Sequence, residues 1–116
     1  MAEQLEELLE AVLKANASDL HLTVGRRPTI RVVGNLMELV KRPVLSPSAV
    51  QDLIFSILTK EQQQRFLAER ELDLSYAFKD RARFRVNVFF QRGFMSAALR
   101  LIPTAIRNFE ELNLPP

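Results

Sequence analysis

The chain has 116 residues, 47% of them hydrophobic and 26% charged, with a formal net charge of +2 at pH 7. This length supplies one hydrophobic core but not two, so any function must belong to a single module. The sequence contains no cysteine, which excludes a disulfide framework, a thiolate nucleophile and a cysteine metal site.

The first predicted element is an amphipathic helix in an acidic segment. Its apolar residues follow the i, i+3, i+4, i+7 spacing and lead to Asn16, a residue that tolerates the left-handed conformation of a helix end. The acidic start lacks the basic and then apolar order of a signal peptide, and no apolar run approaches about 18 residues. We therefore expect a cytoplasmic protein.

Three strands are expected to follow this helix. Leu20, Leu22 and Val24 alternate with polar residues, which is typical of a half-buried strand. After a GRRP turn, residues 29–33 form the second predicted strand. The Gly34-Asn35 pair then favours a hairpin return into a third strand over 36–40.

Two short helices are predicted next. Ser46 followed by Pro47 indicates a helix start, because serine caps free amides and proline has no amide to leave unpaired. Thr59 and the glutamine three residues later have the spacing of a capping box that opens another helix. We expect Phe66 and Leu67 of this helix to face inward.

From Glu71 onward the apolar residues alternate with polar ones again. This pattern predicts three consecutive antiparallel strands, joined by turns at 79–80 and 91–93. The order of helix, strands, two helices and a strand meander predicts an α+β fold. In this fold an antiparallel sheet of about six strands has helices packed on one face.

The first of two unusual features is a row of polar side chains on the strand predicted over 81–90. These side chains are Arg81, Arg83, Arg85 and Asn87. Arginine suits phosphate, because its guanidinium group stays charged and binds in a bidentate manner. The alternative is a solvated face whose arginines pair with Glu71 and Asp73 on the neighbouring strand.

The second unusual feature is Arg100, an isolated charge between Leu99 and Leu101. Such a residue needs either a ligand or a partner, for example a buried carboxylate. The glycines are isolated and no GxxxxGK[ST] loop is present, so the chain lacks the backbone cradle for a nucleotide. If the chain contacts phosphate, its side chains would form only one wall of a site whose phosphate cradle lies elsewhere.

The single histidine, His21, does not indicate a catalytic or zinc site. No second histidine stands at metal-ligand spacing. Ser18, Asp19 and His21 lie close in sequence but lack a placed nucleophile and an oxyanion hole, so local hydrogen bonding is the favoured interpretation.

Three segments together resemble a known family. They are ASDLHLTVGRRPTIRVVGNL, RARFRVNVFFQRGFMSAALRLIP and FEELNLPP, which in this order are similar to the N-terminal domain of the PilT family of type IV pilus retraction ATPases, in the secretion ATPase superfamily. The resemblance covers essentially the whole chain. It implies a PAS-like domain over 1–102 and a linker over 103–116 toward a RecA-like ATPase core that is absent from this sequence.

The resemblance also implies a site and an assembly. The family forms a cytoplasmic hexamer at the inner membrane, at the base of the pilus machine, and drives pilus retraction and twitching motility. Arginines of its N-terminal domain reach the phosphates of ATP, and the matching positions are Arg85 and Arg100, with Arg81 or Arg83 as a weaker third. The Mg²⁺ would be held by the core domain, and this chain alone is not expected to be catalytic.

A stand-alone RNA-binding or scaffold module is the alternative interpretation. The segment RFRVNVFF interleaves basic and aromatic residues as RNA-recognition strands do. Its aromatic residues mostly share the inward face, however, whereas base stacking needs them outward. We therefore expect no nucleic acid partner.

Overall fold

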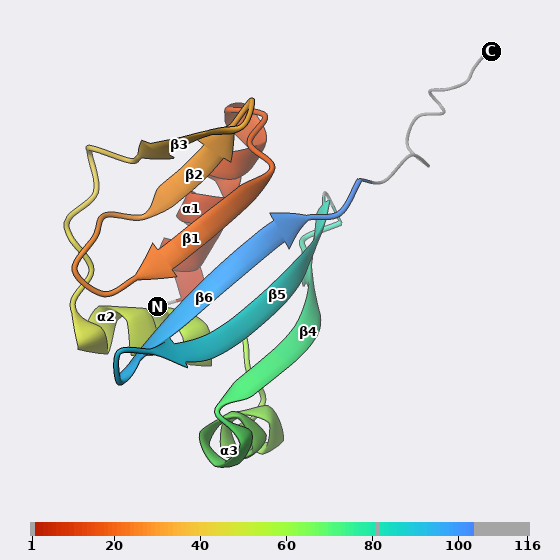
Figure 1. Ribbon diagram of the computed structural model, residues 1–116. Helices are drawn as coiled ribbons and strands as arrows, with labels where there is room; N and C mark the ends of the chain where they lie inside the picture. The colour runs from red at the N-terminus through yellow and green to blue at the C-terminus, as the bar shows by residue number, and fades with distance from the viewer. Residues whose placement is uncertain (1, 81, 104–116) are drawn as a thin grey trace.

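The computed structural model describes residues 2–80 and 82–103 (Figure 1). Its elements, in chain order, are α1 (Ala2–Lys14), β1 (Asp19–Thr23), β2 (Thr29–Val32), β3 (Asn35–Glu38), α2 (Pro47–Phe55), α3 (Lys60–Glu69), β4 (Glu71–Phe78), β5 (Ala82–Gln91) and β6 (Phe94–Leu101). None of these helices has the length and apolar character needed to cross a membrane.

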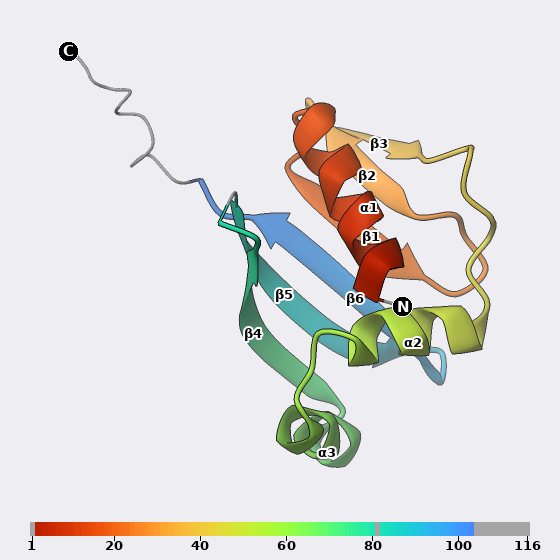
Figure 2. The same ribbon diagram turned by 180° about the vertical axis from the view of Figure 1, so that it is seen from behind.

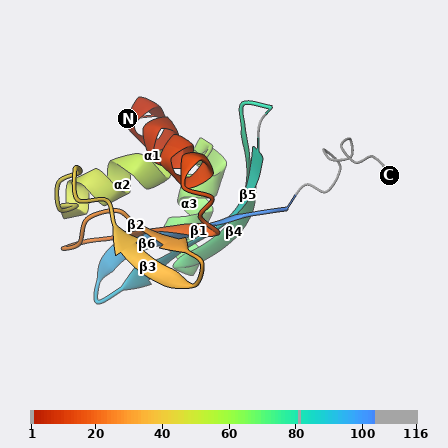
Figure 3. The same cartoon turned by 90° about the horizontal axis from the view of Figure 1, so that it is seen from above.

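The strands form one sheet in the order β3-β2-β1-β6-β5-β4, and every neighbouring pair is antiparallel. The helices of the described chain lie on one side of this sheet, as the view from above shows (Figure 3). The predicted α+β fold, with six antiparallel strands and helices on one face, is confirmed. We call the side turned away from the helices the open face.

The hydrophobic core fills the space between the helices and the sheet. Helix α1 lies over the half of the sheet that contains β1 and β2 (Figure 2). Its apolar stripe is buried there, because the residues at helical spacing all point toward the sheet. Every strand except β3, whose residues are all exposed, contributes apolar residues to this core, among them Leu20, Val86 and Leu99. Their neighbours in sequence therefore point to the open face.

The predicted starts of α2 and α3 are confirmed. They could be predicted because helix capping depends on residues that are close in sequence. The Ser46 hydroxyl accepts a hydrogen bond of 3.1 Å from the Ala49 amide at the start of α2. Thr59 and Gln62 form both halves of the capping box of α3.

One side chain of α3 does not lie where the sequence predicted. Phe66 is buried and stacks on Phe90 of β5 with ring centroids 4.9 Å apart. Leu67, one position further around the helix, is 49% exposed. The expectation that both face inward is wrong, because this short helix contacts the sheet with one narrow stripe.

The hairpin between β2 and β3 turns one residue earlier than predicted. Val33 and Gly34 occupy the turn with φ of 50° and 81°, and Asn35 already pairs with Val32. A turn with two positive φ angles matches the twist of antiparallel strands, and Val33 adopts one of them although the conformation is unfavourable for a β-branched residue. The strand that follows is also shorter than predicted and ends at Glu38.

Two predictions fall on residues that the structure does not describe. Arg81 is one of them. The other is the linker predicted over 103–116, of which Pro103 alone is described. The domain boundary at residue 102 therefore stays a prediction.

Candidate anion site on the open face

Two of the predicted site residues meet on the open face. Arg85 of β5 and Arg100 of β6 are directly opposite each other in the antiparallel register. Both side chains are exposed, because the apolar residues flanking them in sequence point into the core. The structure therefore brings together the two arginines that the resemblance implied.

This pair belongs to a longer row that crosses four strands. Arg100 is opposite Asp19 of β1, and Asp19 is opposite Arg31 of β2. We call Arg31, Asp19, Arg100 and Arg85 the arginine row. It places three guanidinium groups beside one carboxylate, so the middle of the open face carries excess positive charge.

The single carboxylate of the row already has partners on one side. Asp19 accepts a hydrogen bond of 2.5 Å from the Ser18 hydroxyl, contacts the His21 Nε2 atom at 2.5 Å and lies 3.4 Å from the Arg31 Nε atom. Burial raises the pKa of Asp19, but the hydrogen bonds from Ser18 and His21 and the positive charges of His21 and Arg31 outweigh it and lower that pKa. Local hydrogen bonding among these residues is therefore confirmed.

Glu71 and Asp73, the carboxylates expected to pair with the arginines of β5, form hydrogen bonds with the neutral side chain of Asn87 instead. The Asn87 amide donates hydrogen bonds to Glu71 at 3.2 Å and to Asp73 at 2.8 Å. Within the described part of the chain, no carboxylate forms an ion pair with Arg83, Arg85 or Arg100. The alternative is thus correct that Arg83 and Arg85 lie on a solvated face, but wrong that they pair with Glu71 and Asp73.

The alternative of a buried partner for Arg100 is wrong as well, because this side chain is exposed. Like charges directly opposite each other in a sheet are unfavourable. The pair formed by Arg85 and Arg100 is therefore suited to an anion that would offset this repulsion.

A shallow hollow marks the place between the two arginines. Its volume is about 260 Å³, and it is lined by Asp73, Arg85, Asn87, Ala98 and Arg100. The small side chain of Ala98 keeps the floor of the hollow low. Arg83 is exposed on the same face but does not line the hollow. Of the described candidates, Arg85 and Arg100 therefore share one hollow, and Arg83 lies outside it.

Sequence reasoning missed half of the arginine row. Arg31 stands between Ile30 and Val32, which is the same pattern of an isolated charge between apolar residues that drew attention to Arg100. This signal was present in the sequence. The pairing of β1 with β6, which places Asp19 beside Arg100, has no local signal.

Comparison with known proteins shows that the chain is similar to type IV pilus ATPases. No protein-family model matches the chain. The chain is 38% identical over 110 residues to the type IV pilus retraction ATPase PilT of Pseudomonas aeruginosa, which covers 95% of the chain and 32% of that protein. It is 33% identical over 112 residues to the type IV pilus ATPase PilU of the same organism, which covers 97% of the chain and 29% of PilU.

A solved structure shows the same fold. The crystal structure of the pilus retraction motor PilT with bound ADP superposes with a TM-score of 0.81 at 36% identity, covering 95% of the chain and 32% of that structure. The chain thus spans about a third of the length of the relatives it matches. Similar sequence and a shared fold over nearly its whole length show that the chain is a PilT-like N-terminal domain of the secretion ATPase superfamily.

Proposed function

We propose that the chain works as the N-terminal domain of a longer motor ATPase, in which Arg85 and Arg100 contact the phosphates of ATP. The observation that supports this proposal is the pair itself. Two exposed guanidinium groups lie opposite each other in neighbouring strands, and no carboxylate of the described residues is paired with either. The phosphates would offset the repulsion between them.

The residues present suit one wall of a nucleotide site. Guanidinium groups bind phosphate oxygens in a bidentate manner and keep their charge at every physiological pH. The sequence has no phosphate loop, so the cradle for the nucleotide and the ligands of Mg²⁺ would belong to a core domain outside this sequence. The chain alone would therefore not hydrolyse ATP.

The assembly in this proposal follows the relatives. PilT is by name a type IV pilus retraction ATPase, and the structure that the chain matches is a pilus retraction motor with bound ADP. We extend this to a cytoplasmic hexamer that acts in pilus retraction and twitching motility at the inner-membrane platform. Residues 1–102 would form its PAS-like N-terminal domain, and residues 103–116 would lead toward the core.

The first test is to read the coding sequence beyond the codon for Pro116. A GxxxxGK[ST] loop in the same frame would supply the missing phosphate cradle. A stop codon directly after this position would contradict the motor and leave a stand-alone scaffold as the better interpretation.

The second test removes each arginine from the longer protein. We expect Arg100→Ala and Arg85→Ala each to lower ATP turnover on the order of a thousandfold, the effect of losing an arginine that stabilises a transferring phosphoryl group. Steady-state ATPase rates measure this effect. Arg65→Ala is the matched control, because Arg65 is an exposed arginine on α3 outside the hollow.

The fold of each variant is checked by circular dichroism. Both side chains at issue are exposed, so we expect the far-ultraviolet spectrum and the melting temperature to stay close to those of the parent. Normal turnover in folded Arg100→Ala would remove the assignment of Arg100 to the phosphates.

A further inference from the structure

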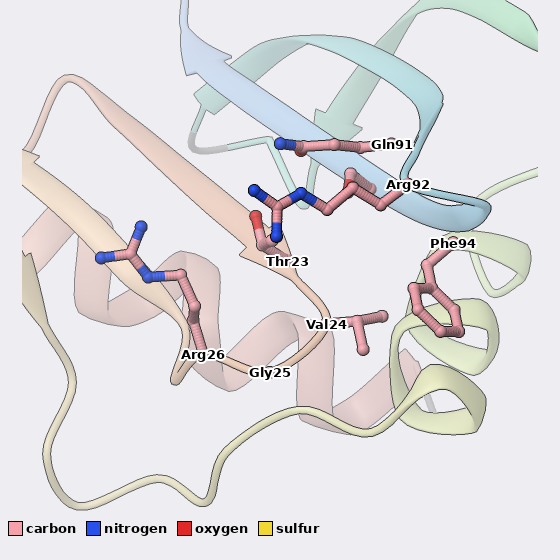
Figure 4. A pocket seen from close by; sticks show the side chains of 8 residues that line it. Thr23, Val24, Gly25, Arg26, Gln91, Arg92 and Phe94 are labelled. Atoms are coloured by element: carbon pink, nitrogen blue, oxygen red, sulfur yellow. The ribbon is translucent and has the colours of Figure 1, made fainter.

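A second cavity lies at the end of the sheet, where the turn between β1 and β2 meets the turn between β5 and β6 (Figure 4). Its volume is about 440 Å³. Its lining includes Thr23, Val24, Arg26, Arg92, Phe94 and Ser96. This cavity shares no residue with the hollow between Arg85 and Arg100. Ser96 and Arg100 are four residues apart on β6, which corresponds to about 13 Å along a strand.

Two cationic side chains of this cavity have no anionic partner. Among the described residues, neither Arg26 nor Arg92 forms an ion pair, and no carboxylate lines the cavity. Figure 4 shows the two guanidinium groups on either side of the Thr23 hydroxyl. The adjacent Arg27 differs, because it pairs with Glu38 at 3.6 Å and donates to the Arg42 carbonyl at 3.1 Å.

A buried hydroxyl is the second, independent feature of this cavity. Ser96 is 1% exposed and lines the cavity wall. It lies opposite Thr23 in the pairing of β1 with β6, so both side chains point to the open face. The structure gives the Ser96 hydroxyl no hydrogen bond within the described residues. Buried polar groups normally have a partner, and a ligand in the cavity would supply one.

The other end of the cavity is apolar. In Figure 4 the Val24 side chain points toward the Phe94 ring, and Phe94 is 45% exposed although it is a large aromatic residue. The cavity thus joins a cationic end that contains hydroxyl groups to an aromatic end. Its volume falls in the range of about 300 to 1,000 Å³ that is usual for small-molecule sites.

We propose that this cavity binds a phosphorylated small molecule, with its phosphate between Arg26 and Arg92 and its apolar or planar part against Phe94. The guanidinium groups of Arg26 and Arg92 and the hydroxyl residues Thr23 and Ser96 line the cationic end. A phosphate has three terminal oxygens and nearly two negative charges to offer these donors, whereas a carboxylate has two oxygens and one charge. The aromatic end favours a ligand that carries a flat apolar group beside its phosphate.

The test uses adenosine monophosphate as the probe, because it joins one phosphate to a planar ring. The chain is titrated with this nucleotide, with adenosine and with inorganic phosphate, and amide resonances are followed by NMR. We expect the nucleotide to shift residues 23–26 and 91–96. Inorganic phosphate should shift the same residues at higher concentration, and adenosine should shift none of them.

Variants separate a specific site from general attraction of anions. Arg26→Ala and Arg92→Ala should each raise the dissociation constant for the nucleotide about tenfold or more, as expected for a lost charge-assisted contact. Arg27→Ala removes the same charge from the adjacent position and should leave the constant unchanged. Equal losses in Arg26→Ala and Arg27→Ala would overturn the proposal, as would shifts that avoid 91–96.

The buried hydroxyl gives a separate readout. Ser96→Ala should weaken nucleotide binding without lowering the melting temperature, because the hydroxyl loses no protein partner. A lower melting temperature with unchanged binding would mean that Ser96 is purely structural and would remove it from the site. ATP turnover reports on Arg85 and Arg100, whereas shifts at 91–96 report on this cavity, so the two proposals fail independently.

Discussion

At the scale of single residues, Asp19 decides which arginines of the open face are available. The pairing places it between Arg31 and Arg100, but its carboxylate contacts Arg31 together with Ser18 and His21. Arg100 is therefore left without an ion pair on the described part of the sheet. The carboxylate of Asp19 thus forms an ion pair with Arg31 at the β2 end of the arginine row, whereas Arg100 and Arg85 at the other end have no such pair among the described residues.

This role of Asp19 predicts how stability depends on pH. The folded state lowers the pKa of Asp19 below its ordinary value of 3.8, so the unfolded chain binds the proton at higher pH. The resulting stabilisation is complete above pH 3.8 and is lost as the pH falls through the lower folded pKa. Asp19→Asn should reduce stability at pH 7 by about 1 to 3 kcal/mol and flatten the acid limb of the stability curve.

Urea denaturation between pH 2 and pH 7 measures this effect. Asp52→Asn, on the exposed side of α2, is the matched control and should keep the acid limb of the parent. An unchanged pH dependence in Asp19→Asn would show that the contacts of Asp19 contribute nothing to stability.

Sequence patterns predicted some of these residues and not others, for a physical reason. Strand alternation depends on neighbours in sequence, so it correctly assigned Arg83 and Arg85 to the face opposite the core. The partner of a charged side chain depends on the register between paired strands, which the alternation within one strand does not determine. The pairing of Glu71 and Asp73 with Asn87 rather than with arginine was for that reason not predicted.

At the scale of elements, α3 also combines a feature that local sequence predicts with one that depends on tertiary contacts. Its capping box was predicted because the residues involved are three apart. The inward face of the helix was predicted only in part. Phe66 is the residue that becomes buried, because its ring stacks on the ring of Phe90. The guanidinium group of Arg70 lies over the same Phe90 ring, 3.8 Å from its centre. Contacts with β5 therefore fix the rotation of this helix.

Two adjacent substitutions test this arrangement. Phe66→Ala should lower the free energy of unfolding by about 3 to 5 kcal/mol, because it leaves a cavity in a fully buried site. Leu67→Ala, on the exposed side of the same helix, should cost less than about 1 kcal/mol. Chemical denaturation of the two variants gives both values. Similar losses in the two variants would contradict the observed rotation of α3.

At the scale of the whole molecule, the decisive feature is the join between β1 and β6. The sequence indicates two strand meanders, because each consists of neighbouring strands with short turns. It contains no local sign that the first strand of one meander pairs with the last strand of the other. This non-local pairing completes the sheet and the arginine row, so neither could be predicted in full.

The arrangement of the whole sheet also bears on the RNA-binding alternative. The aromatic residues of β5 lie mainly on the helix side, where Phe84 is buried and Phe90 stacks on Phe66. Single-stranded RNA needs aromatic rings on an exposed face. We therefore expect a flat fluorescence anisotropy titration with a labelled single-stranded RNA at low salt. Micromolar affinity with a steep salt dependence would restore the RNA-binding interpretation.

The position of β6 has a mechanical consequence. The chain leaves the sheet at the end of β6, where the Leu101 amide donates to the Ser18 carbonyl and the Ile102 amide donates to the Arg83 carbonyl, each at 2.9 Å. A pull on the chain beyond this point would load the hydrogen bonds on both sides of β6 together, in shear. Arg100 lies one residue inside this strand end, next to these hydrogen bonds. The sheet would therefore resist such a pull as a rigid unit, and the backbone of Arg100 would stay fixed between β1 and β5.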